Sequence, residues 1–82
     1  MEVERVQTGM RLEKRTLKVL KATAEMLDMS LGDLVEGIVL HAFEGKTPFG
    51  QETLKRIESL KGVYGLQVSA ADSHRMKEGD HG

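Results

Sequence analysis

The feature that most restricts the fold of this chain is a single alternating segment, residues 5–12, which stands ahead of segments with helical spacing. Every second residue of this segment is apolar or carries a methyl group: Val6, Thr8, Met10 and Leu12. This period of two predicts a half-buried β-strand. A lone strand leaves its backbone N–H and C=O groups unpaired, so it needs a second strand beside it.

The chain offers no convincing second strand, since residues 63–68 are only a weak candidate. The simplest solution is the same segment of a second copy, paired antiparallel about a two-fold axis. The apolar face of this two-stranded ribbon would cover a core formed by the helices of both chains. Its other face would present Gln7, Gly9 and Arg11 twice. The alternation therefore predicts a homodimer.

Helical spacing begins near Lys14. Apolar residues then recur at intervals of three, four and three, which places them on one helical face: Leu17, Leu20, Ala24 and Leu27. The stretch is also rich in Leu, Lys, Glu, Ala and Arg, which are good helix formers. We expect this helix to end near Asp28-Met29, because an aspartate can adopt a left-handed backbone conformation at modest cost.

The clearest helical signal follows directly after this turn. Its apolar residues fit one helical face without a miss: Leu31, Leu34, Val35, Ile38, Val39, Ala42 and Phe43. Ser30 is a good N-cap, and Asp33 lies in the first turn, where the helix dipole favours an acid. Gly45 and Pro48 are expected to end the helix. Gly37, inside it, predicts a close approach by another helix.

A third helix is predicted from about Pro48 or Gln51 to Lys61, with Gly62 ending it. Leu54, Ile57 and Leu60 would line one face of this helix. Beyond it the residues become small and polar, which predicts a disordered tail. The expected organisation is a dimerisation domain at 1–45, a helical extension at 46–66 and a disordered tail at 67–82.

Composition supports an oligomer. The 82 residues include no Cys and no Trp, and only 4% are aromatic. Disulfides and Cys-based zinc sites are excluded, and so small a chain builds a marginal core unless another subunit completes it. No apolar run approaches the ~20 residues of a membrane span, and the N-terminus does not read as a signal peptide. We therefore expect a cytoplasmic protein without a membrane partner.

In its order of strand, helix, tight turn and helix, the chain resembles the ribbon-helix-helix family of DNA-binding proteins (the Arc, MetJ and CopG type). The resemblance covers about residues 5–45 and is carried by the segment Val6–Leu12, the Asp28-Met29-Ser30 turn and the two helices around that turn. It implies a mainly α fold with one β-strand. Two chains would form an intertwined homodimer around a two-stranded antiparallel ribbon, and the predicted C-terminal helix would be an addition to this plan.

The resemblance also implies a DNA site. Alternate strand residues would enter the major groove, so Gln7, Gly9 and Arg11 become the expected base contacts. Phosphate contacts are expected at four residues: Arg5, Lys14, Ser30 and Leu31. An arginine such as Arg11 can form two hydrogen bonds to guanine, and a glutamine such as Gln7 can form two to adenine. A helix N-terminus binds phosphate through its free N–H groups.

The expected function is therefore sequence-specific transcriptional regulation, as a repressor that binds double-stranded DNA as a homodimer or a higher oligomer. One alternative is an antitoxin, whose residues 46–66 would bind a toxin protein instead of capping the dimer. Another is a dimeric interaction module that does not bind DNA. No pattern typical of catalysis or metal binding occurs, so we expect no enzyme, no catalytic residue, no metal and no cofactor.

Overall fold

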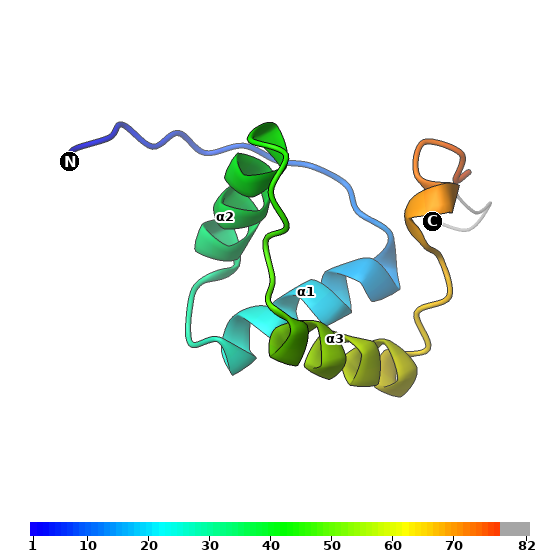
Figure 1. The fold of residues 1–82 in the computed structure, drawn as a ribbon. Helices are drawn as coiled ribbons and strands as arrows, with labels where there is room; N and C mark the ends of the chain where they lie inside the picture. Colours follow the sequence, from blue (N-terminus) through cyan, green and yellow to red (C-terminus); the bar gives the residue numbers. More distant parts are fainter. Residues whose placement is uncertain (78–82) are drawn as a thin grey trace.

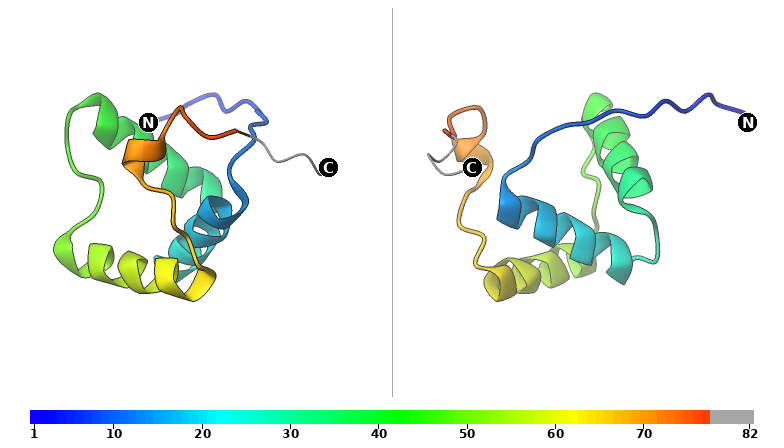
Figure 2. Two further views of the ribbon diagram at one scale, coloured as in Figure 1. Left: turned by 90° about the vertical axis from the view of Figure 1, so that its right-hand side faces the viewer. Right: turned by 180° about the vertical axis from the view of Figure 1, so that it is seen from behind.

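A computed structural model describes residues 1–77 and shows a small all-α protein with three helices (Figure 1). The helices are α1 (Lys14–Met26), α2 (Leu31–Phe43) and α3 (Gln51–Tyr64), followed by a one-turn 3-10 helix, η1 (Ala70–Asp72). α1 packs against both other helices, whereas α2 and α3 make no contact with each other. α1 is therefore the central element, with α3 antiparallel along one side of it (Figures 1 and 2).

Residues 1–13 form an N-terminal arm that extends past α2 before the chain turns into α1 (Figure 2). No strand occurs within residues 1–77, so the predicted strand at 5–12 does not form in the single chain. Residues 63–68 are not a strand either, because they include the end of α3 and the turn after it. The physical reason at 5–12 is the one that the sequence raised: no other segment within residues 1–77 pairs with the arm's backbone.

α1 begins and ends through local interactions. The carboxylate of Glu13, the N-cap, accepts hydrogen bonds from the backbone N–H groups of Arg15 (3.1 Å) and Thr16 (2.8 Å). At the other end, Asp28 has φ of 60°, the left-handed conformation expected for it. This left-handed residue ends the helix and turns the chain directly into α2, so the predicted tight turn is confirmed.

α2 has the bounds that its apolar spacing predicts. The Ser30 hydroxyl accepts a hydrogen bond from the N–H of Asp33 at 3.1 Å, which confirms its role as the N-cap. Gly45 follows the helix with φ of 70°, a conformation in which a side chain would cost energy. A Cβ added at Gly37 would meet nothing within 4 Å, so the close approach predicted there does not occur within the chain.

α3 runs one turn further than predicted. Gly62 lies inside the helix, and the left-handed residue that ends it is Gly65, with φ of 68°. The Arg15 guanidinium, from the start of α1, donates a hydrogen bond to the Gly65 carbonyl at 3.3 Å. A cation at a helix C-terminus interacts favourably with the helix dipole and the terminal carbonyls. The true end of α3 therefore depends partly on a residue 50 positions away.

The buried core of the single chain is small. Its buried residues are Val19, Thr23, Ala24 and Leu34. Thr23 donates its hydroxyl hydrogen bond to the Val19 carbonyl at 2.7 Å, which satisfies the buried oxygen. Many other apolar side chains are exposed, and Val6 and Phe43 each retain about 80% of their accessible surface. One chain alone thus leaves the apolar side chains of the arm and those of the C-terminal half of α2 largely uncovered.

Two overall dimensions support this observation. The chain exposes 7232 Å², whereas a compact monomer of 9.1 kDa exposes about 4,900 Å². Its radius of gyration is 14.0 Å, against about 12 Å for a compact domain of this length. The extended arm and the segment after α3 contribute to this excess surface, together with the open side of α2.

The residues after α3 contain η1, where the Asp72 carboxylate accepts a hydrogen bond from the N–H of Ser69 at 2.8 Å. These hydrogen bonds are local, and the expected disorder of residues 67–82 stays a prediction; residues 78–82 lie outside the described part of the chain. Within residues 1–77, no helix has the length and apolar character needed to cross a membrane.

Candidate functional site

The arm and α2 form an open groove of about 660 Å³, which we call the arm–helix groove. Its apolar lining comes from the arm, from α1 and from α2: Val6, Thr8, Met10, Leu12, Leu17, Leu31, Val35, Val39 and Leu40. All four residues predicted for the inner face of the ribbon are in this set. Leu17, Leu31 and Val35 are half-buried, and the other six side chains are exposed.

The predicted base contacts are distributed differently. Gln7 and Arg11 are exposed and do not line the arm–helix groove, whereas Gly9 does. A Cβ added at Gly9 would meet nothing within 4 Å, so this glycine is not required by crowding within the chain. Arg5 also lines the groove, so two of the four residues that the alternation places on the outer face lie at the groove, and only Gln7 and Arg11 are separated from the apolar set.

Arg5, a predicted phosphate contact, is engaged by α2. Its guanidinium lies 2.9 Å from the Glu36 carboxylate and 3.7 Å from that of Asp33. All three side chains are more than half exposed, so water screens these ion pairs and each contributes little to stability. They nevertheless connect the arm to the outer side of α2 beside the arm–helix groove. Sequence reasoning assigned Arg5 to DNA and did not find this contact.

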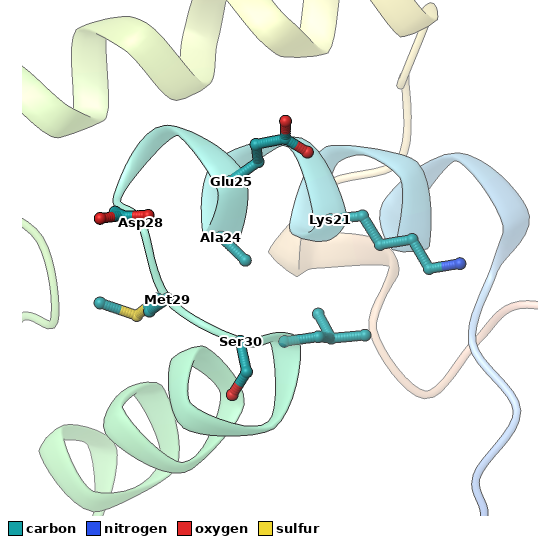
Figure 3. A pocket seen from close by; sticks show the side chains of 7 residues that line it. Lys21, Ala24, Glu25, Asp28, Met29 and Ser30 are labelled. Atoms are coloured by element: carbon teal, nitrogen blue, oxygen red, sulfur yellow. The ribbon is translucent and has the colours of Figure 1, made fainter.

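Ser30 and Leu31 line a second, shallower hollow of about 480 Å³ at the junction of α1 and α2 (Figure 3). The Ser30 hydroxyl binds the N–H of Asp33, while the N–H groups of the first helical residues have no acceptor inside the helix. The α1 side of the hollow carries Lys21, Glu25 and Asp28 (Figure 3). The electrostatic environment of the predicted phosphate site is therefore mixed, with a lysine beside two carboxylates.

Lys14, the remaining predicted phosphate contact, is exposed at the first position of α1. Its neighbour Glu13 was missed by sequence reasoning, which named no cap for this helix. The N–H groups of Arg15 and Thr16 hold the pKa of the Glu13 carboxyl below its ordinary value, because they stabilise the charged form. An acidic residue directly before a run of helix formers is the signal that could have found it.

The outer part of α2 also differs from the prediction. Phe43 was assigned to the core by its spacing, yet it is 79% exposed, and Leu40, which the apolar spacing omits, is also exposed. Among the residues of the predicted apolar face, only Leu34 is buried. α1 covers a single side of α2, so the remaining apolar residues require a further surface.

In comparisons with models of protein families, with curated proteins and with solved structures, nothing matched this chain. The ribbon-helix-helix resemblance therefore rests on the residues and helices described above.

Proposed function

We propose that this protein is a sequence-specific DNA-binding transcriptional regulator that acts as a homodimer, with the arms of two chains forming a β-ribbon for the major groove. One observation carries this proposal. Val6, Thr8, Met10 and Leu12 line the arm–helix groove together with Arg5 and Gly9, whereas Gln7 and Arg11 lie outside it. Pairing of two arms would satisfy their backbone groups and present these polar side chains to base edges.

The uncovered apolar surface supports the dimer. Val39 and Phe43 on α2, together with the arm, leave a surface that a second copy could bury. A second α2 could also supply the helix whose close approach Gly37 predicts.

The DNA contacts follow from the same arrangement. Arg11 and Gln7 would read bases, and Gly9 would allow the ribbon backbone to lie close to them. Ser30 and Leu31 would bind a phosphate at the N-terminus of α2, with Arg5 and Lys14 as further phosphate contacts. Arg5 can contact a phosphate only when it leaves Glu36 and Asp33. Its contribution to DNA affinity is therefore the free energy of the phosphate contact minus that of the two carboxylate contacts it loses.

The test is a fluorescence titration of duplexes from the region upstream of the protein's own gene, against scrambled duplexes at the same salt. Arg11→Ala should weaken specific binding by about 1–3 kcal/mol per half-site and reduce the preference over scrambled DNA. Arg56→Ala on α3 is the matched control, since it removes the same exposed charge from another element. Equal binding of both duplexes by wild type and Arg11→Ala would refute base reading by the arm.

An antitoxin is the second candidate, and the exposed end of α3 favours it. α3 packs on α1, yet at its C-terminal end Val63 is 75% exposed and Tyr64 is 38% exposed. A toxin could cover this apolar surface. Co-purification with the product of an adjacent gene, abolished by Val63→Asp while DNA binding persists, would support this function.

A further inference from the structure

Three lysines form one stripe along the exposed side of α1: Lys14, Lys18 and Lys21. Their spacing of four and three residues places them on one helical face, away from the buried residues Val19 and Thr23. Within residues 1–77, none of the three forms an ion pair, whereas Lys46 and Lys61 do. We call this set the lysine stripe.

The lysine stripe is unfavourable for α1 itself. Lys14 lies in the first turn, where a positive charge opposes the helix dipole, and that turn contains no acid. Lys14 and Lys18 are like charges four residues apart, which mildly destabilises a helix. The charges thus weaken the element that carries them, although the N-cap carboxylate of Glu13 and the acid Glu25, four residues after Lys21, offset part of the effect.

The position of the stripe connects the two parts of the proposed DNA site. Lys14 follows the arm directly, and Lys21 lines the hollow that also contains Ser30 and Leu31 (Figure 3). From Lys14 to Lys21 the helix rises about 10 Å. One strand of duplex DNA carries about three phosphates over that distance along its axis. With α1 lying along the duplex axis, the stripe would present about as many charges as the phosphates of one strand that it passes.

We propose that Lys14, Lys18 and Lys21 form a phosphate-contacting track that holds one strand of duplex DNA between the arm and the N-terminus of α2. This inference rests on the proposed function and adds Lys18 and Lys21 to its contacts. An anionic membrane fits the stripe less well. A helix bound at a lipid surface needs an apolar face to insert, and the buried residues of α1 are already packed inside the chain.

The experiment compares Lys18→Gln and Lys21→Gln with the matched control Lys55→Gln, which removes an exposed charge from α3. Glutamine keeps the helix propensity close to that of lysine, and circular dichroism verifies the fold of each variant. Affinity for specific and scrambled duplexes is measured at several salt concentrations.

Each stripe variant should weaken binding to both duplexes alike, by roughly 5–10-fold at moderate salt. It should also reduce the slope of log affinity against log salt by about 0.9 per lost phosphate contact, twice over in a dimer. Lys55→Gln should leave the slope unchanged. Unchanged slopes for Lys18→Gln and Lys21→Gln would overturn the track, even where Arg11→Ala shows that the arm reads bases.

The same titrations also separate failure of the proposed base reading from failure of the track. Lysine-dependent binding without any sequence preference would support the track and refute the proposed base reading. The last measurement tests binding to vesicles of phosphatidylcholine and phosphatidylserine. Lysine-dependent binding to these vesicles, with no binding to duplex DNA, would overturn the assignment of the stripe to nucleic acid.

Discussion

At the scale of single residues, Glu13, at the junction of the arm and α1, is the ionisable group with the clearest set of hydrogen bonds. Its carboxylate accepts hydrogen bonds from the backbone of Arg15 and Thr16 and from the Thr16 hydroxyl at 2.9 Å. These donors bind the charged form and lower the pKa of Glu13 in the folded state. The cap is therefore an acid-sensitive contact at the point where the arm meets the helix.

The sign of the pH effect follows from this lowered pKa. Glu13 stabilises the fold at pH values above its unfolded pKa, and this contribution is lost as the pH falls through the folded pKa. Glu13→Gln should therefore reduce stability at neutral pH and flatten the loss of stability on acidification. Urea unfolding between pH 3 and 7 measures this, with Glu52→Gln on α3 as the control. A Glu13→Gln curve parallel to wild type at every pH would contradict the role of the cap.

Arg5 shows that one residue can have two competing uses. Its ion pairs with Glu36 and Asp33 connect the arm to α2, and the same guanidinium is a proposed phosphate contact. These pairs are exposed and weak, so DNA phosphates can compete for the arginine. The acidic residues of α2 therefore hold the arm beside α2 only weakly.

At the scale of elements, α2 depends on its N-cap. Ser30→Ala removes the acceptor for the Asp33 N–H and should destabilise the fold by about 1 kcal/mol. Ser59→Ala, inside α3, provides the control, because the Ser59 hydroxyl bonds only to the Lys55 carbonyl, at 3.4 Å. Urea denaturation midpoints compare the two variants. Equal shifts would mean that the Ser30 hydroxyl does not stabilise the start of α2.

The arm and α3 show how elements depend on distant contacts. Arg15 bonds to the carbonyl of Gly65, so the start of α1 is linked to the end of α3. The arm, by contrast, has an apolar alternation but no strand to pair with in the described part of its own chain. Helices complete their hydrogen bonds internally, whereas a strand needs a neighbour, which explains why the helices form here and the strand does not.

At the scale of the whole molecule, the uncovered apolar surface predicts an obligate homodimer. Val39 lines the arm–helix groove and remains 39% exposed in one chain. Val39→Asp would bury an uncompensated charge in the proposed interface and should unfold the protein at micromolar concentrations. Val63→Asp is the matched control, since Val63 is 75% exposed on α3 and should tolerate the charge.

Sedimentation equilibrium and circular dichroism test this prediction together. Wild type and Val63→Asp should sediment as folded dimers, and thermal stability should rise with protein concentration, as expected when folding and association are coupled. A folded wild-type monomer that persists at all concentrations would refute the obligate dimer.

Local signals made α1, α2 and their junction predictable from the sequence. The apolar spacing of α2, the Ser30 cap and the left-handed Asp28 each act within a few residues, so they need no knowledge of distant contacts. The same holds for the alternation of the arm, whose four apolar positions line one groove. Because alternate residues of an extended segment point to opposite sides, the same pattern separated Gln7 and Arg11 from these four residues.

Other features depend on contacts between distant segments and were not readable from local patterns. Gly62 and Gly65 are equivalent stop signals in the sequence, but the carbonyl of Gly65 is the one that Arg15 reaches. The engagement of Arg5 by Glu36 joins residues 31 positions apart. Lys21 enters the candidate site only because the turn at Asp28 brings the end of α1 beside the start of α2. Spacing along a chain specifies which residues share a face of one element, whereas the packing of several elements determines which faces meet.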